Sequence, residues 1–344
     1  MNKELQVLEA NKTWELVLLP PNKILIGCKW VYRIKFHVDG TIERYKARLV
    51  AKGFNQKEGI NYIETFAPVA KMVIVRALLV LVLHHNWFIE QLDINNVFLH
   101  GDLHEEVYMT IPQGYSKQLL PNTLCKLTKS LYGLKQTNRQ WFQKLITFLL
   151  TIGFQQSYAD TSLFTLTEGL HFTTLLVYVD DILIAGNHKP TIDSIKQELY
   201  NQFSIKDLGP LHYYLGIEIF RNDHGLVISE RKYVLELLKC GNVLNDKPIS
   251  THLDPIQSLN LTDGEPLSDP SLYRTLVGKL IYLTIIKPDI SFAAQLLSKF
   301  SQASKTPHMK TLLKVLRYIK LCLGQSLHFP TTNNLQLTVY CDSN

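Results

Sequence analysis

The sequence predicts an α+β fold, and three observations lead to this class. Residues 24–54 and 217–229 have the composition of strand pairs that turn back on themselves at short polar segments. Residues 141–152 and 192–203 carry apolar side chains at helical spacing. The two kinds of segment do not alternate regularly, so a parallel sheet built from β-α-β units is not expected.

Composition limits the class of protein further. The chain has 344 residues, of which 46% are hydrophobic and 19% charged, so it can bury a sizeable core in two or three domains. The five cysteines are widely spaced without a Cys-x-x-Cys pair, so neither a disulfide scaffold nor a zinc ribbon is expected. No secretory signal fits the N-terminal residues, and Arg76 interrupts the longest apolar stretch, 72–83. We therefore expect no membrane partner.

The first half of the chain contains two predicted hairpins. Residues 24–37 and 41–51 form the first, because both are rich in β-branched and aromatic side chains and an Asp-Gly turn signal separates them. The single run 175–185 predicts the second strand pair. The other elements expected here are a buried helix over 72–85, a strand over 88–94 and amphipathic helices over 141–152 and 192–203.

The second half is predicted to be mainly helical. A hairpin over 217–229 leads into a helix over 230–240 that ends before a glycine. Residues 245–270 are polar and contain several prolines, which makes them the best candidate for a domain boundary. Helical patterns then cover 273–284, 290–300 and 310–323, and a strand is expected over 335–341. The chain stops soon after this strand, and we expect a truncated domain there.

Charge is distributed in blocks. Lys plus Arg number 36 against 30 for Asp plus Glu, a net charge of +6. Basic residues concentrate in 23–57, 117–144 and 299–320, whereas 90–106 and 168–181 are acidic. Alternating blocks of this kind are typical of a polyanion bound beside a cation site. Ordinary solvated faces are the alternative interpretation.

Two adjacent carboxylates form the most informative pattern. Asp180 and Asp181 interrupt an otherwise apolar run, 175–185. The simplest geometry is a hairpin with both aspartates at its tight turn, although Asp-Asp suits a two-residue turn poorly because both central residues need positive φ. Burying two like charges is costly unless cations neutralise them, and hard cations such as magnesium take oxygen ligands. A metal site is therefore favoured over an ordinary turn.

Asp93 offers a third carboxylate at the end of the strand 87–93. Two magnesium ions bridging Asp93 and Asp180 would activate an attacking hydroxyl and stabilise a leaving pyrophosphate. This arrangement requires the strand to lie beside the hairpin, which spacing alone does not establish. No Gly-x-Gly and no Walker lysine motif occur, which excludes the common nucleotide-binding loops.

A series of short motifs runs along nearly the whole chain. They are Lys-Trp-Val-Tyr-Arg at 29–33, Arg-Tyr-Lys-Ala-Arg-Leu-Val-Ala-Lys-Gly-Phe at 44–54, Glu-Thr-Phe-Ala-Pro-Val at 64–69, Gln-Leu-Asp to Phe-Leu-His-Gly at 91–101, Lys-Ser-Leu-Tyr-Gly-Leu-Lys-Gln at 129–136, Tyr-Val-Asp-Asp at 178–181, and further matches at 206–209, 214–216, 273–278 and 287–290. In this order they resemble the reverse transcriptase of copia-type LTR retrotransposons, over about residues 13–344.

The resemblance implies a right-hand polymerase fold of fingers, palm and thumb over residues 13–258. A connection region would follow over 259–334, and residues 335–344 would be the first strand of a ribonuclease H-like domain. The implied activity is RNA-directed DNA polymerisation on an RNA or DNA template with a primer, using deoxynucleoside triphosphates. The implied location is intracellular, in a cytoplasmic particle or the nucleus.

The resemblance also implies roles for particular residues. Asp93, Asp180 and Asp181 would be the palm carboxylates, with two magnesium ions on Asp93 and Asp180 and Asp181 as a weaker ligand. Phe98 would exclude a ribose 2′-hydroxyl. The remaining implied residues are Lys46 or Arg48 at the incoming triphosphate, Tyr132, Gly133 and Lys135 at the new base pair and template, and Asp342 as the first acid of a ribonuclease H domain whose other residues are missing.

A catalytically dead fragment that keeps the fold and binds nucleic acid is the alternative interpretation. Val97 stands where the family usually has alanine, and its larger side chain would crowd the sugar pocket. Thr137-Asn138 replaces the usual Ala-Pro, which would loosen the loop near the base pair. The complete set of aspartates favours the enzyme, whereas these departures and the truncation favour the dead fragment.

Overall fold

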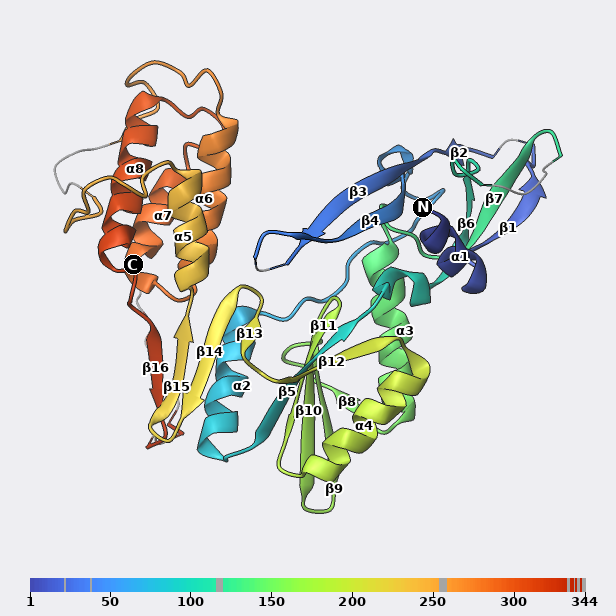
Figure 1. The fold of residues 1–344 in the computed structure, drawn as a ribbon, viewed down its shortest axis with the longest axis horizontal. Helices are drawn as coiled ribbons and strands as arrows, with labels where there is room; N and C mark the ends of the chain where they lie inside the picture. The colour runs from blue at the N-terminus through green and yellow to red at the C-terminus, as the bar shows by residue number, and fades with distance from the viewer. Residues whose placement is uncertain are drawn as a thin grey trace. The chain divides into compact units, whose positions relative to one another are not determined.

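The computed structural model describes residues 1–21, 23–37, 39–115, 120–253, 259–332, 335–336, 338 and 341. The chain forms two compact units. The first unit contains Met1–Val75 and Trp87–Gly209, and the second contains Arg76–Asn86 and Pro210–Asn344. Helices and strands are mixed in both units (Figure 1), in agreement with the predicted α+β class.

A six-stranded sheet forms the centre of the first unit. The strand order is β12-β5-β11-β10-β9-β8. The strands are β5 (Phe88–Ile94), β8 (Gln155–Gln156), β9 (Leu163–Glu168), β10 (His171–Tyr178), β11 (Asp181–Gly186) and β12 (Ile205–Pro210). Apolar side chains of β5, β10 and β11 form one buried cluster with helices α3 (Thr137–Thr151) and α4 (Lys189–Gln202). Both helices therefore cover the same face of this sheet.

The rest of the first unit precedes or interrupts this sheet in sequence. A second sheet has the order β1-β7-β6-β2 and shares a core with the N-terminal helix α1. These elements are α1 (Asn2–Ala10), β1 (Trp14–Leu18), β2 (Leu25–Ile26), β6 (Asp102–Met109) and β7 (Thr123–Lys129). A separate hairpin pairs β3 (Cys28–Phe36) with β4 (Ile42–Ala51). Two short 3₁₀ helices, η1 (Gly53–Asn55) and η2 (Val97–His100), complete the unit.

Helices dominate the second unit. Helices α5 (Arg231–Cys240), α6 (Ser271–Leu283), α7 (Ser291–Ser298) and α8 (Thr306–Leu321) share one apolar core. A sheet of order β13-β14-β15-β16 joins Tyr213–Tyr214, Ile217–Asn222, Gly225–Ser229 and Leu327–Pro330. The short 3₁₀ helix η3 (Pro288–Ile290) leads into α7. Most of α2 (Met72–His84) belongs here, where the Arg76 guanidinium donates to the Ile285 carbonyl at 3.0 Å. Within the described residues, no helix has the length and apolar character needed to cross a membrane.

The sequence located the principal hairpins and helices but missed several elements. Strand β5 has the predicted bounds, whereas the strand expected over 24–37 is divided at Gly27 into β2 and β3. Helix α1 and the strands β1, β6, β7, β8, β9, β12, β13 and β16 were not expected. Of the strand expected over 335–341, residues 337, 339 and 340 lie outside the described residues, and the other four are not in a strand.

Glu230, which precedes α5, is a buried carboxylate in the second unit. Glu230 is only 2% exposed, and neither of its carboxylate oxygens has a hydrogen-bond partner among the described residues. Burial raises the pKa of Glu230 to about 8, and the nearby Lys287 ammonium offsets only part of this effect. The folded protein therefore keeps a proton on Glu230 at pH values where the unfolded chain has lost it.

We expect Glu230→Gln to remove a pH dependence of stability. In the wild type, stability should fall by about 3–5 kcal/mol as the pH rises from the ordinary pKa of 4.5 to about 8, because folding then requires uptake of a proton. The glutamine stays neutral throughout this range and should show no such fall. Urea unfolding followed by circular dichroism at pH 5 and pH 8 measures the difference, with the exposed Glu236→Gln as control. Equal pH dependence in wild type and Glu230→Gln would contradict the prediction.

Candidate active site

The three aspartates meet at one end of the central sheet. Strand β5 pairs with β11 in an antiparallel register that sets Asp93 opposite Asp181. The neighbouring Leu92 and Ile182 point into the core beneath α3 and α4. Because side chains alternate along a strand, Asp93 and Asp181 lie on the opposite face of the sheet. The strand required beside the hairpin is therefore in place.

The turn that precedes Asp181 differs from the predicted one. Tyr178 pairs directly with Asp181, so the two turn residues are Val179 and Asp180. The prediction that Asp180 and Asp181 together form the turn is wrong by one residue. Val179 takes the positive φ, 57°, that a turn of this length requires, and Asp181 starts the strand. This register leaves the Asp180 carboxylate in the turn and the Asp181 carboxylate on the sheet.

The surroundings of Asp93 and Asp181 disfavour the negative charge of these two carboxylates. Burial raises the pKa of Asp93, and the charge of Asp180 raises it further. Burial also raises the pKa of Asp181, although a hydrogen bond from the Gln91 side-chain amide, 3.1 Å from Asp181 Oδ1, acts in the opposite direction. A bound cation would favour the charged forms. The sequence analysis did not single out Gln91, because only the strand register brings its amide to Asp181.

The carboxylates can supply part of a metal site. No group of three or more histidine, cysteine, aspartate or glutamate side chains within the described residues is arranged to hold a metal ion. A magnesium site, however, commonly uses only one or two carboxylates and takes its other ligands from water and substrate phosphates. Asp93 and Asp180 are hard oxygen donors whose charges act on each other. They therefore suit a site of this kind.

The β3–β4 hairpin has one basic face. Its register sets Arg33 opposite Lys46, Lys35 opposite Arg44, and Val31 opposite Arg48. Burial and the neighbouring positive charges lower the pKa of Lys46. The charges of Lys46 and Lys35 act on Asp93. The hairpin therefore places cations within electrostatic range of the aspartates.

Three of the predicted nucleotide-site residues form a cluster. The Phe98 and Tyr132 rings meet edge to face, with centroids 5.0 Å apart. The Arg48 guanidinium carbon lies 4.6 Å from the centroid of Tyr132. Arg48 Nε is buried and has no hydrogen-bond partner among the described residues. Residues from β4, η2 and the loop before α3 are thus brought together around one aromatic ring.

Gly133 lies where the loop before α3 meets β4. Its φ is +91°, and a Cβ atom at this position would collide with the Ala51 carbonyl oxygen. This close approach allows the Ala51 amide to donate to the Tyr132 carbonyl at 2.7 Å. Glycine at 133 therefore fixes Tyr132 beside β4.

Lys135 is turned toward residues 56–62. Its ammonium lies 3.3 Å from both the Gln56 carbonyl oxygen and the Tyr62 hydroxyl. Beneath it, the Gln56 side chain donates to Gln136 Oε1 at 3.0 Å, and Gln136 donates to the Asn61 carbonyl at 3.0 Å. These amides are buried and were missed by the sequence analysis, although Gln136 is part of the motif at 129–136.

The two departures from the family pattern have clear local positions. Val97 is 2% exposed and belongs to the apolar core beneath the sheet. Thr137 begins α3, and its hydroxyl donates to the Leu131 carbonyl at 2.8 Å. Both residues therefore have packing or hydrogen-bond partners in the folded unit. Asp342 lies outside the described residues.

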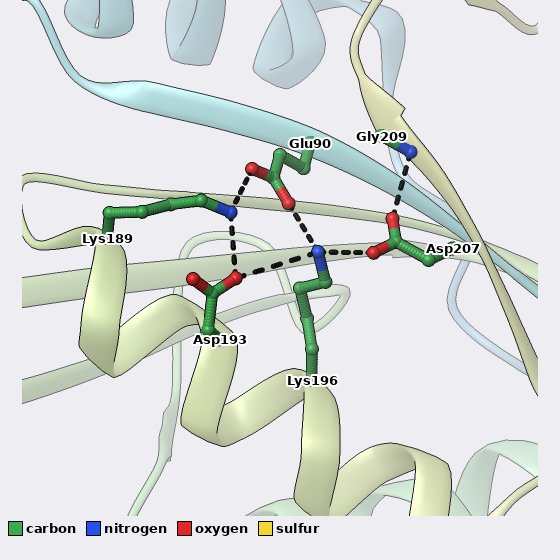
Figure 2. A network of polar contacts seen from close by, with 6 residues as sticks. All are labelled: Glu90, Lys189, Asp193, Lys196, Asp207 and Gly209. Carbon is green, nitrogen blue, oxygen red and sulfur yellow. Dashed lines mark hydrogen bonds and ion pairs between the residues drawn. The ribbon is translucent and has the colours of Figure 1, made fainter.

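A network of charged side chains holds α4 against β5 and β12 (Figure 2). Glu90 projects from the helix-covered face of β5 and accepts hydrogen bonds from Lys189 and Lys196 of α4, the latter at 2.6 Å. Lys196 also pairs with Asp207 of β12, whose other carboxylate oxygen accepts from the Gly209 amide at 2.8 Å. The network therefore fixes the strand that carries Asp93.

Comparisons with known proteins give one consistent result. A family model described as reverse transcriptase (RNA-dependent DNA polymerase) matches residues 11–255. The chain is 44% identical over its full length to the retrovirus-related Pol polyprotein from transposon RE1 of Arabidopsis thaliana, and covers 24% of that relative. It is 39% identical, over 96% of the chain, to the corresponding polyprotein from transposon TNT 1-94 of Nicotiana tabacum, and covers 26% of it. The chain thus spans about a quarter of these relatives.

We expect Glu90→Gln to destabilise the first unit by about 2–4 kcal/mol, because it leaves two partly buried ammonium groups without their shared carboxylate. Asp193→Asn is the matched control from the same network. The Asp193 side chain is 53% exposed, against 9% for Glu90, so its loss should cost less than about 1 kcal/mol. Tryptophan fluorescence during urea unfolding selectively follows the first unit, which contains Trp14, Trp30, Trp87 and Trp141. Equal losses in the two variants would refute the assignment.

Proposed function

Because the chain belongs to the reverse transcriptase family, we propose that it synthesises DNA on an RNA or DNA template as part of a copia-type retrotransposon Pol polyprotein. The observation that carries this proposal is the meeting of Asp93, Asp180 and Asp181 at one end of the paired strands β5 and β11, with Asp180 in the adjoining turn. The reaction is attack of a primer 3′-hydroxyl on the α-phosphate of a deoxynucleoside triphosphate, with displacement of pyrophosphate.

Within a right-hand polymerase, the six-stranded sheet with α3 and α4 would be the palm. The β3–β4 hairpin would belong to the fingers. The proposed division of the chain is fingers, palm and thumb over 13–258, a connection region over 259–334, and the start of a ribonuclease H-like domain over 335–344. Asp342 would be the first catalytic acid of that last domain.

Asp93 and Asp180 would hold two magnesium ions, with Asp181 as a weaker ligand. When bound, the ions would lower the charge cost of the primer alkoxide and of the leaving pyrophosphate. The protein's contribution is to present the carboxylates at fixed positions on paired strands. The hydrogen bond from Gln91 to Asp181 supports the weaker role of Asp181, since one of its oxygens is already engaged.

The incoming nucleotide would lie between the basic face of the hairpin and the aspartates. Lys46 or Arg48 would bind the triphosphate, and the buried, unpaired Arg48 Nε supports a contact of this kind. Phe98 would lie below the sugar and exclude a 2′-hydroxyl. Tyr132, Gly133 and Lys135 would border the new base pair and the template.

The basic segments 117–144 and 299–320 would contact the phosphates of template and primer, so binding should weaken as salt rises. We place the protein in the cytoplasmic particle or nucleus in which such elements copy their RNA. The alternative, a catalytically dead fragment that keeps the fold and binds nucleic acid, is separated from the enzyme by the first experiment below.

Primer extension on an RNA template with magnesium tests the proposed activity. Wild-type protein should extend the primer, and Asp180→Asn should reduce extension by at least about 1,000-fold because it removes one metal-binding charge. The exposed Asp223→Asn, on the β14–β15 turn, should leave extension unchanged. Salt-sensitive binding of template and primer by a wild type that does not extend would establish the dead fragment instead.

Phe98→Ala is expected to weaken sugar selection. Removing the ring should raise incorporation of ribonucleotides relative to deoxynucleotides by about 10- to 100-fold, because a 2′-hydroxyl then meets no side chain. Single-nucleotide incorporation with dATP and ATP measures the ratio. Phe148→Ala is the control, since Phe148 packs against the same core and its ring lies beside Phe203 rather than Tyr132. An unchanged ratio in Phe98→Ala would assign Phe98 to packing alone.

A further inference from the structure

The turn that carries Asp180 has an unfavourable backbone conformation. Val179, its first residue, has a φ of 57°. A β-branched side chain is poorly suited to this left-handed region, and such a conformation persists only where surrounding contacts impose it. The position of the Asp180 carboxylate depends on this turn. The contacts that hold Val179 are therefore the contacts that set Asp180.

One of these contacts comes from α3. The Trp141 indole Nε1 donates a hydrogen bond to the Val179 carbonyl oxygen at 2.8 Å. Trp141 is 1% exposed and belongs to the core between α3 and the sheet. Its ring meets Phe203 edge to face, with centroids 5.2 Å apart. The donor is thus held by packing on the covered face of the sheet and points to the turn.

A second contact holds the next carbonyl. The Ile94 amide of β5 donates to the Asp180 carbonyl oxygen at 2.9 Å. Both carbonyl groups of the two-residue turn are therefore bonded, one by a side chain and one by the backbone. The Ile94 bond continues the β5–β11 pairing and survives most side-chain changes. The Trp141 bond depends on a single N–H group.

Trp141 also lies against the segment that carries Phe98. Helix α3 packs on η2, and a Cβ atom at Gly101 would come within 2.9 Å of the Trp141 backbone nitrogen. The His100 ring centroid lies 5.9 Å from that of Trp141. Trp141 is thus adjacent both to the turn after β10, which carries Asp180, and to the segment after β5, which carries Phe98.

We propose that Trp141 is a positioning residue for DNA synthesis, which holds the Val179–Asp180 turn through its indole N–H and so fixes the Asp180 carboxylate. The inference rests on the proposed polymerase function. It assigns to the N–H a role separate from the role of the ring in packing.

Trp141→Phe tests the inference, because it removes the N–H and keeps an aromatic ring in the core. We expect kcat for primer extension to fall by about 10- to 100-fold, since small displacements of a catalytic group have effects of this size. The template–primer Kd should change less than about twofold, and the magnesium concentration for half-maximal rate should rise. Benzothienylalanine at 141, which keeps the bicyclic ring but has sulfur in place of N–H, should reproduce the defect if phenylalanine packs too poorly.

Thr174→Val is the matched control. Thr174 is a buried residue of β10, the strand that leads into the turn. Its hydroxyl donates to the Phe164 carbonyl at 3.0 Å. Its loss also removes one side-chain hydrogen bond to a backbone carbonyl, so the melting temperature should fall about as much as with benzothienylalanine at 141, whereas Trp141→Phe also loses ring packing and should lower it further. Only the residue-141 variants should lower kcat and shift the magnesium dependence.

The outcomes separate this inference from the proposed function. Extension by the wild type, with kcat and magnesium dependence unchanged in both residue-141 variants, would overturn the role of Trp141 and leave the polymerase proposal intact. Equal kcat losses in Thr174→Val and Trp141→Phe would also overturn it, because they would indicate general destabilisation. A wild type that binds template and primer without extending would overturn the proposed function, and with it this inference.

Discussion

The antiparallel register of β5 on β11 is the constraint on which the candidate active site depends. It sets Asp93 opposite Asp181 and brings both beside Asp180, although like charges at this spacing repel. The register is specified by the other face, where Leu92 and Ile182 enter the core. A shift of one residue in β5 would turn Asp93 toward α3 and α4 and move Leu92 out of their core. Apolar burial on one face of the sheet therefore offsets electrostatic repulsion on the other.

The two faces of β5 carry carboxylates that have different partners. On the covered face, Glu90 is neutralised by two lysines of α4. On the other face, Asp93 lies opposite another carboxylate and has its pKa raised by burial and by Asp180. Two carboxylates of one strand thus have opposite surroundings. Glu90 is paired with ammonium groups, whereas Asp93 faces another carboxylate. The face covered by α3 and α4 therefore fixes the strand, and the other face carries the candidate metal-binding carboxylates.

Features that depend on residues close together in the sequence were predictable, and features that depend on distant residues were not. Strand β5 and the hairpin around Asp180 were predictable, because alternation and β-branched composition are local signals. The turn was misplaced by one residue, because contacts of Val179 outweigh its preference against positive φ. Family resemblance supplied the nucleotide-site residues one by one. Neither approach revealed the link between Gln56 and Gln136, because two buried amides far apart in sequence carry no periodic or compositional signal.

The candidate site combines acidic strand ends with a basic hairpin, and one of its basic groups has incomplete hydrogen bonding. Arg48 Nε is buried without a hydrogen-bond partner among the described residues, and Arg48 lies against Tyr132 rather than against the aspartates. Leaving such a group unpaired costs stability that a simple ion pair would recover. A metal-bound triphosphate, the ligand of the proposed function, would offer cations to the carboxylates and an oxygen to Arg48 Nε. The arrangement therefore stabilises the folded protein less than direct pairing would, and is better suited to a ligand that carries both charges.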